Sequence, residues 1–571
     1  NMGNHQEISS FIWNVCDEVL RGLFKQHEYG DVILPFVVLR RLDCVIEPSK
    51  DEVIKLYNEL KDEVDPTPII KKQTGLKFFN HSNYDLQRLK GDPNGLKVNF
   101  PNYINGFSQN VFEILENFQL DKPVEKLLKN NKLYLLIDKF TEIDLHPDVV
   151  DNHMMGNVFE ELLRKFSEMS NETSGEHYTP RDVVNLLTSL VFSQSEDNLE
   201  GDGIIRSIFD PCCGTGGMLT MGKEWIDKNI DNKVRLNLYG QELNSHTYSI
   251  CKSDMLISGG DPDNIKVGSS LSEDHFEGRK FDYMITNPPF GVSWKSEKDF
   301  VLEESKNPYG RFNAGTPRVS DGSLLFLQHM VSKMKDDGSR IGVVFNGSPL
   351  FTGDAGSGES EIRRWIIEND WLECIVALPD QLFFNTGIST YIWVVTNKKK
   401  EERKGKVQMI DGSSFFKSMK KSLGSKRKEI SSAQSDKLIK AYVDFQEDDF
   451  SKIYDNEFFG YTKVVVEQPL KENGVIQKKK DGSIKPDSSL RDSERIILTD
   501  DIEEYFDREV KPHLTESWMD REKDKVGYEI NFTKYFYKYK PLRSLESITS
   551  DLLKLEKESE GIFKEIVNEE V

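Results

Sequence analysis

The residues with the clearest chemical potential are Asn287, Pro288, Pro289 and Phe290, which follow an apolar run at 281–286. Two consecutive prolines stiffen a turn and remove backbone donors. The Asn287 side-chain oxygen and the Pro288 carbonyl can then both accept hydrogen bonds from one amino group. Such acceptors favour a pyramidal nitrogen with a lone pair free to attack, and Phe290 offers a flat face to an extruded base. These four are therefore our predicted catalytic residues.

A second chemical signal lies upstream, between Asp210 and Gly217. An apolar run ends at Asp210, and a glycine-rich turn and a predicted helix follow, which lets the backbone approach a ligand. A carboxylate here repels a pyrophosphate and attracts a cationic amino acid group. Glu242 ends the next predicted strand, where an acidic side chain can accept from both hydroxyls of a ribose. These positions favour S-adenosylmethionine as the cofactor, with Asp210, Gly214, Thr215, Gly216, Gly217 and Glu242 binding it.

These turns need a parallel sheet to position them. Between about residues 149 and 400, β-branched and aromatic runs alternate with helical patterns, which is the rhythm of an α/β doubly wound, Rossmann-like domain. Because the predicted cofactor and catalytic residues lie within this range, we expect it to be the methyltransferase domain. Residues 1–148 are predicted to form a mostly α-helical N-terminal domain. Residues 401–571 are predicted to be an irregular, partly helical C-terminal extension. The strands are expected at 204–209, 235–239, 281–286, 340–345, 373–378 and 390–396, a hairpin near 478–482, and a closing helix at 544–567.

Composition narrows the class of protein. The 571 residues carry a net charge of −21, whereas a protein that wraps DNA alone is normally basic, so either nucleic acid is absent or a partner supplies positive surface. Residues 398–428 are the exception, with twelve basic and three acidic residues, and we interpret them as a solvated connector. The six cysteines show no C-x-x-C spacing, so no metal site or disulfide is predicted. No apolar stretch is long enough to span a membrane.

Three motifs resemble, in order, those of amino-group DNA methyltransferases of the N6-adenine type, at 175–180, 210–217 and 287–290. The stretch at 33–43 resembles the helical N-terminal domain of type I restriction–modification methyltransferase (M) subunits. The stretch at 378–390 resembles a later segment of the same family. Because unrelated segments agree in order, the chain is identified by resemblance as a member of this family.

The resemblance implies methyl transfer from S-adenosylmethionine to the N6 amino group of adenine in double-stranded DNA. It adds three expected cofactor contacts, Tyr178, Thr179 and Pro180. Related enzymes usually have an aspartate after the glycine that is Gly268 here, and that acid contacts adenine or the cofactor. This chain has Ser269 instead, so either the hydroxyl suffices or a neighbour such as Asp254 substitutes. We retain Ser269 among the expected cofactor-binding residues.

The resemblance also implies partners. A separate DNA-specificity subunit, flanked by two M copies, would choose the sequence, and a restriction and translocase subunit would complete the complex. The sequence contains no phosphate loop of the form G-x-x-x-x-G-K-[ST], so we expect this chain neither to translocate nor to cut DNA by itself. The expected location is the cytoplasm of a prokaryote, with no membrane partner.

Three alternatives stay open. A self-sufficient adenine methyltransferase would read its target sequence with residues 400–571. A protein-glutamine methyltransferase also uses an Asn-Pro-Pro turn, usually followed by Tyr, and Phe290 and the long helical N-terminal region count against it. A non-catalytic scaffold would bind cofactor and partners only, and the intact Asn287 and Glu242 oppose that interpretation.

Overall fold

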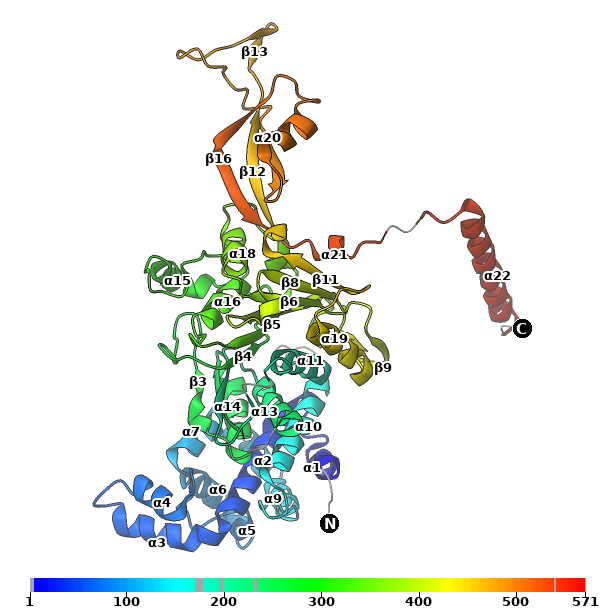
Figure 1. Ribbon diagram of the computed structural model, residues 1–571. Coiled ribbons are helices and arrows are strands. Elements are labelled where there is room, and N and C mark those ends of the chain that lie inside the picture. Colours follow the sequence, from blue (N-terminus) through cyan, green and yellow to red (C-terminus); the bar gives the residue numbers. More distant parts are fainter. Residues whose placement is uncertain (1–4, 170–177, 196–198, 231–233, 539–540, 570–571) are drawn as a thin grey trace. The chain divides into compact units, whose positions relative to one another are not determined.

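The computed structural model describes residues 5–169, 178–195, 199–230, 234–538 and 541–569 (Figure 1). Contacts divide the chain into two compact units, Asn1–Ile530 and Asn531–Val571. Of the motif at 175–180, Gly175, Glu176 and His177 lie outside the described residues. Tyr178, Thr179 and Pro180 lie inside them.

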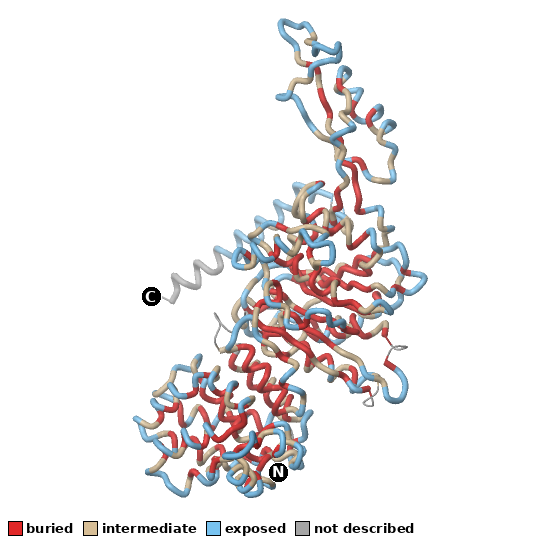
Figure 2. The backbone as a smooth tube through the Cα atoms, turned by 90° about the vertical axis from the view of Figure 1, so that its left-hand side faces the viewer, coloured by how far each residue is buried: buried red, intermediate tan, exposed pale blue. Residues whose placement is uncertain are grey.

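The first part of unit Asn1–Ile530 is helical, as predicted, and has its own apolar core (Figures 1 and 2). Helix α2 (Tyr29–Ile46) lies in this core, because its sequence is apolar on almost every side and most of its side chains are buried. The other helices are α1 (His5–Leu20), α3 (Lys50–Leu60), α4 (Thr67–Thr74), α5 (Leu86–Leu89), α6 (Leu96–Asn105), α7 (Gln109–Asn117), α8 (Asp121–Lys129), α9 (Leu133–Thr141) and α10 (Asn152–Met169).

A buried cation joins these helices to the segments that follow. The Arg41 side chain of α2 is fully buried and donates to the carbonyls of Leu145 and Val150, both at 2.6 Å, and of Ile257 at 3.1 Å. Burial lowers the pKa of the guanidinium. Because Ile257 ends α14 (Ser245–Ile257), which packs on the sheet, Arg41 fixes the helical region against the sheet region.

The central element is a nine-stranded sheet in the order β11-β8-β6-β7-β5-β4-β1-β2-β3. Strand β7 runs antiparallel to β5 and β6, β11 runs antiparallel to β8, and the other neighbours are parallel. Every strand expected before residue 400 is present, and the predicted α/β fold is confirmed. The strands are β1 (Ile205–Asp210), β2 (Arg235–Glu242), β3 (Ile265–Val267), β4 (Tyr283–Thr286), β5 (Arg340–Asn346), β6 (Leu372–Ala377), β7 (Thr390–Thr396), β8 (Lys406–Asp411) and β11 (Ser451–Asp455).

Helices pack against this sheet, and turns connect them to the ends of the strands. Helices α11 (Arg181–Phe192), α13 (Gly217–Asn229) and α19 (Ser432–Asp444) pack against the strands, and α11 contacts the other two. The other helices of this region are α15 (Lys298–Ser305), α16 (Ser323–Val331), α17 (Ser348–Phe351) and α18 (Gly358–Glu368). Because β1, β2, β4 and β5 are parallel, their carboxyl ends meet at one edge of the sheet, where ligands bind in such folds.

The sheet continues past residue 400, where the methyltransferase domain was expected to end, because β8 and β11 lie at its edge. Between these strands lie α19 and the antiparallel hairpin of β9 (Lys417–Leu423) and β10 (Lys426–Glu429). An antiparallel three-stranded sheet follows, made of β12 (Gly460–Glu467), β15 (Asp492–Ile497) and β16 (Trp518–Tyr528). Between β12 and β15 in sequence, β13 (Lys471–Glu472) pairs with β14 (Val475–Ile476), and the short helix α20 (Ile502–Tyr505) follows β15. The hairpin expected near 478–482 is present, because Lys478 pairs with Ile484 in an antiparallel bridge.

Unit Asn531–Val571 contains α21 (Phe532–Tyr535) and α22 (Leu545–Glu569). Helix α22 matches the closing helix expected at 544–567. Among its described side chains, those of Leu545, Ile548, Leu552, Leu553 and Leu555 are apolar and exposed. In the part of the chain that the structure describes, no helix is both long enough and apolar enough to cross a membrane.

Candidate active site

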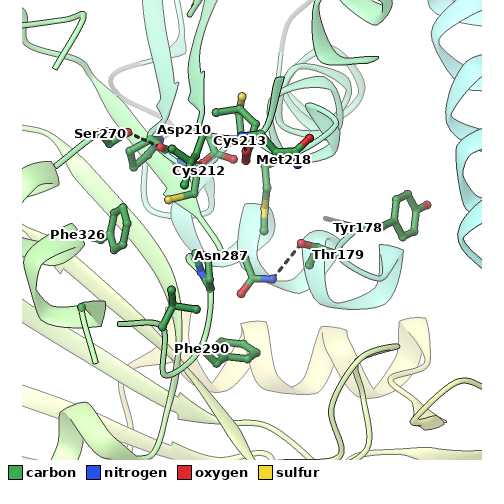
Figure 3. A pocket seen from close by; sticks show the side chains of 18 of the residues that line it. Tyr178, Thr179, Asp210, Cys212, Cys213, Met218, Ser270, Asn287, Phe290 and Phe326 are labelled. Atoms are coloured by element: carbon green, nitrogen blue, oxygen red, sulfur yellow. Dashed lines mark hydrogen bonds between the residues drawn. The ribbon is translucent and has the colours of Figure 1, made fainter. Parts of the chain in front are cut away.

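A cavity of about 930 Å³ opens at the carboxyl edge of the parallel strands (Figure 3). Its wall includes the predicted site residues Tyr178, Thr179, Asp210, Gly214, Thr215, Gly217, Glu242, Ser269, Asn287, Pro289 and Phe290. Three predicted residues, Pro180, Gly216 and Pro288, are not part of the wall. The fold therefore brings the two chemical signals of the sequence, the glycine-rich turn and the Asn-Pro-Pro-Phe turn, to one space.

The glycine-rich turn after β1 is shaped by backbone conformations that favour glycine. Gly214 and Gly216 have φ angles of +54° and +88°. A Cβ atom at Gly216 would come within 2.8 Å of the Cys251 sulfur, so this glycine faces the protein rather than the cavity. At Gly217, where α13 begins, a Cβ atom would meet nothing within 4 Å. The open space at Gly217 and the start of α13 leave room for a ligand.

Asp210 ends β1 and is the charged group nearest to this turn in sequence. Its side chain is buried, and Oδ1 accepts the Cys212 backbone N–H at 2.9 Å. Oδ2 has no hydrogen-bond partner among the residues that the structure describes. Burial raises the pKa of Asp210 to about 7 and the nearby Glu242 adds to the increase, whereas the neighbouring Thr286 hydroxyl and the Cys212 N–H act in the opposite direction. A buried oxygen without a partner is costly, so the site fits a ligand that brings a donor or a positive charge.

Glu242 ends β2 on the neighbouring strand. Its Oε2 accepts the Asn244 backbone N–H at 2.8 Å, and Asn244 in turn caps α14 by accepting the Thr247 N–H at 3.0 Å. The Glu242 side chain lines the cavity and has little exposure. Because Oε2 is oriented by the backbone, the carboxylate is held in place to accept from hydroxyl groups of a ligand.

Asn287 directly follows β4, and in Figure 3 its side chain lies below the residues of the glycine-rich turn. Its Nδ2 donates to the Thr179 hydroxyl at 3.1 Å, a contact that the sequence did not predict. Its Oδ1 has no hydrogen-bond partner in the described part of the chain. The Thr179 contact therefore fixes the amide and leaves one acceptor oxygen available to a donor in the cavity. Pro288 is buried beside it, whereas Pro289 is exposed and lines the cavity.

Phe290 is held at the cavity wall by the segment that precedes β7. Its ring meets Phe383 edge-on, with the centroids 5.4 Å apart and the planes at 88°. The same segment supplies Asn385, Thr386 and Ile388 to the wall. The sequence identified the stretch at 378–390 only by resemblance and assigned no role to it. The structure puts it at the Phe290 side of the cavity.

Ser269 lines the cavity, and a carboxylate lies beside it. The Ser269 hydroxyl donates to Glu297 Oε1 at 3.3 Å, and Glu297 is also part of the wall. The alternative named from the sequence, Asp254, is buried in α14, where it accepts the Thr220 hydroxyl at 2.8 Å, and it is not part of the wall. The acid that accompanies Ser269 is thus Glu297, which is 28 residues away in sequence and carries no local signal.

Two further residues of the cavity wall, Glu160 and Asn346, were missed by the sequence analysis. The Tyr178 hydroxyl donates to Glu160 at 2.9 Å, and Arg181 lies 3.2 Å from the same carboxylate, so Tyr178 is anchored to α10. Asn346, which ends β5, lines the cavity, and its Oδ1 has no partner among the described side chains and backbone groups. Its position at the end of a parallel strand is the one signal that would have identified it.

Comparison with known proteins gives the family. Residues 150–479 match the N-6 DNA Methylase family, and residues 8–140 match the HsdM N-terminal domain. The chain is 27% identical over 485 residues to the type I restriction enzyme MjaIX methylase subunit of Methanocaldococcus jannaschii, covering 82% of each protein.

Solved structures agree with this assignment at the level of the fold. The type I restriction-modification system methyltransferase subunit from Streptococcus thermophilus superposes with a TM-score of 0.63 at 23% identity, over 80% of this chain and 97% of that one. A chain from a structure on complex assembly and conformational transition of the type I R-M system gives a TM-score of 0.55 at 18% identity, over 98% of both. The chain therefore belongs to the N-6 DNA methylase family, with an HsdM N-terminal domain, which confirms the predicted resemblance to type I methyltransferase subunits.

Proposed function

We propose that this chain is the modification subunit of a type I restriction–modification system. It is an adenine-specific DNA methyltransferase that uses S-adenosylmethionine and acts on the N6 amino group in double-stranded DNA. The observation that carries the proposal is that Asp210 and Asn287 line one cavity, and each has a buried oxygen, Oδ2 and Oδ1 respectively, without a hydrogen-bond partner among the described residues. One is a carboxylate suited to a cationic ligand and the other a neutral acceptor suited to an amine.

The residues on the β1 and β2 side fit the cofactor. Asp210 Oδ2 would accept from its ammonium group, and Glu242 would accept from the ribose hydroxyls. The turn at 214–217 would offer the amino acid end open space at Gly217 and its backbone N–H groups other than that of Gly216, which donates to the Cys213 carbonyl at 2.8 Å. Ser269 and Glu297 together offer acceptors for the adenine end. S-adenosylmethionine, when bound, would supply a methyl group on a positively charged sulfur.

The residues on the β4 side act on the target. Asn287 Oδ1 accepts an N–H of the adenine amine, which localises the nitrogen lone pair that conjugation with the ring otherwise withdraws. The Thr179 hydroxyl keeps the amide in this orientation. Phe290, supported by Phe383, stacks on the extruded base. With the lone pair localised in this way, the amine nitrogen would accept the methyl group from the cofactor sulfur and would then release its extra proton to solvent, so these residues need not include a strong base.

Partners follow from the family and from charge. With a net charge of −21, this chain has little long-range attraction for phosphate, so a DNA-specificity subunit supplies target choice and most of the binding free energy. Two copies of this chain would flank one specificity subunit, and a restriction and translocase subunit would join the complete complex. We place this complex in the prokaryotic cytoplasm, with the exposed apolar side chains of α22 as a contact for another subunit.

The test is transfer of tritiated methyl from labelled cofactor to plasmid DNA or to protein, with and without the specificity subunit. We expect label in DNA adenine, and only at a low level without the partner. Strong label at one defined motif with the chain alone would favour the self-sufficient enzyme. Label in protein would favour the glutamine methyltransferase, and no transfer despite cofactor binding would favour the scaffold.

A further inference from the structure

The hairpin of β9 and β10 is a basic surface on an acidic chain. Its exposed cations are Lys417, Lys420, Lys421 and Arg427. Within the described residues, none of these four has an acidic partner within 4.0 Å. Two other cations of the hairpin are used structurally, because Lys426 pairs with Asp182 and Lys428 pairs with Asp380. The four exposed charges are therefore available to a ligand.

The hairpin is anchored by its backbone to the segment that lines the cavity. The Ser425 N–H donates to the Phe384 carbonyl at 2.8 Å, and the Arg427 N–H donates to the Gln381 carbonyl at 2.9 Å. Gly424 has a φ of +58°, and a Cβ atom there would lie 2.4 Å from the Phe384 carbonyl oxygen. The close approach of the two segments thus requires glycine at this turn.

A buried lysine gives the hairpin a second anchor. The Lys426 ammonium, with a side chain only 7% exposed, lies 3.1 Å from the Asp182 carboxylate and donates to the Leu382 carbonyl at 3.0 Å. Asp182 also accepts the Ile430 N–H at 2.9 Å. Because Asp182 is in the first turn of α11, three residues after Thr179, the hairpin is fixed close in sequence to the side chain that orients Asn287.

These contacts place the hairpin next to the side of the cavity that is lined by Asn287 and Phe290, which we call the target side. The segment it is bonded to supplies Asn385, Thr386 and Ile388 to the wall, and Phe383 from the same segment supports Phe290. In Figure 1, β9 is drawn beside α19, and the Lys426–Asp182 ion pair joins β10 to α11. The hairpin that carries the exposed cations is therefore bonded to the same segment that forms the proposed base-binding wall.

We propose that the β9–β10 hairpin binds the phosphate backbone of duplex DNA next to the adenine that enters the cavity. The inference rests on the proposed function and adds a positioning role for residues outside the cavity. Exposed lysine and arginine side chains on an anchored hairpin are suited to phosphate oxygens. Among the described residues, no large apolar side chain is exposed between Ile388 and Val443, so a phosphate backbone fits this face better than the apolar centre of a protein interface.

The test removes the four charges and measures the salt dependence of DNA binding. The variant is Lys417→Gln, Lys420→Gln, Lys421→Gln and Arg427→Gln, assembled with the specificity subunit. The probe is a duplex carrying the motif that the wild-type complex methylates, or a random duplex if none is methylated. Each lost phosphate contact lowers the slope of log affinity against log salt by about 0.9, so the slope should become shallower by about 3 to 4.

A matched control removes four exposed lysines elsewhere. The substitutions Lys478→Gln, Lys479→Gln, Lys480→Gln and Lys485→Gln change the net charge equally in the turn beyond β14, and the slope should change by less than about 1. Cofactor affinity and the turnover number at saturating DNA should match the wild type in both variants, whereas KM for DNA should rise only in the hairpin variant.

The outcomes separate this inference from the proposed function. If the wild-type complex methylates adenine and the hairpin variant keeps the wild-type slope, the hairpin proposal is overturned and the proposed function stands. Failure of the hairpin variant to assemble with the specificity subunit would also overturn it, in favour of a protein contact. If the wild-type complex transfers no methyl to DNA, the proposed function fails, and the slopes on random duplex still decide whether the hairpin binds phosphate.

Discussion

The two sides of the cavity hold their key oxygens in different ways. At the end of β1, Asp210 is ionisable and buried, and a backbone N–H of the adjoining turn holds it. At the end of β4, Asn287 is neutral and half-buried, and the Thr179 side chain from a distant segment holds it. A buried charge suits a ligand that carries a permanent positive charge. A neutral acceptor suits an amine that becomes positive only during the reaction.

Because the two sides bind different groups, substitutions on each side should change a different measured quantity. Changes on the β1 and β2 side should alter the affinity for cofactor, and changes on the β4 side should alter the rate of transfer. If both sides affected both quantities equally, the cavity would not be divided as we propose.

Replacing Asn287 by Ala should have the largest effect. Loss of an acceptor at a developing positive charge costs about 3 kcal/mol or more, so transfer should slow at least about a hundredfold. Cofactor affinity should remain within about twofold of wild type, because Asp210 and Glu242 are untouched. Single-turnover transfer and calorimetric titration measure the two quantities. Transfer within about threefold of wild type would contradict the assignment of Asn287.

Replacing Glu242 by Ala should weaken cofactor binding by about 2 kcal/mol, roughly thirtyfold, because two charge-assisted hydrogen bonds are lost. Glu242→Gln is the matched control, since it keeps an acceptor oxygen and should lose less. Titration calorimetry of the purified variants gives the dissociation constants. An unchanged constant for the alanine variant would mean that the ribose acceptor lies elsewhere in the wall.

The pH dependence of cofactor binding should report on Asp210. Burial raises its pKa to about 7, and a cationic ligand group stabilises the ionised form, so below that pH binding must release a proton. Affinity should therefore rise by up to about tenfold per pH unit towards pH 7 and level off above it. Titrations in buffers of different ionisation enthalpy measure the released proton. The same dependence in an Asp210→Asn variant would assign it to another group.

Replacing Thr179 by Val should give the smallest effect. It removes the hydroxyl that accepts from Asn287 Nδ2 while keeping the shape of the side chain. A neutral hydrogen bond contributes about 1 kcal/mol, so transfer should slow about fivefold. Thr179→Ser keeps the hydroxyl and serves as the control. Equal single-turnover rates in the two variants would show that Asn287 does not need this partner.

Local signals were sufficient for much of the fold and the site. The runs that end at Asp210, Glu242 and Thr286 were identified as strands, because β-branched and aromatic residues are followed by turn residues, and the turns they predict line the cavity. Parallel strands bring their carboxyl ends to one edge, so the two turns could be expected to meet. The resemblance to the family then assigned a role to each motif.

Contacts between distant segments could not be predicted in this way. Thr179 and Asn287 are 108 residues apart, Ser269 and Glu297 are 28 apart, and Lys426 and Asp182 are 244 apart. Each contact depends on how the chain packs rather than on its local pattern. For the same reason, the charge run at 398–428 was interpreted as a solvated connector. In the structure it contains β8 and a hairpin anchored beside the cavity.

The most direct test of the account is methylation mapping of plasmid DNA by long-read sequencing. The plasmid is incubated with S-adenosylmethionine and with this chain alone, with the chain and its specificity subunit, or with the Asn287→Ala chain and that subunit. We predict N6-methyladenine at one defined motif in the second reaction, and little in the first and third. Methylation on cytosine, or wild-type levels of N6-methyladenine with the Asn287→Ala chain, would contradict the central claim.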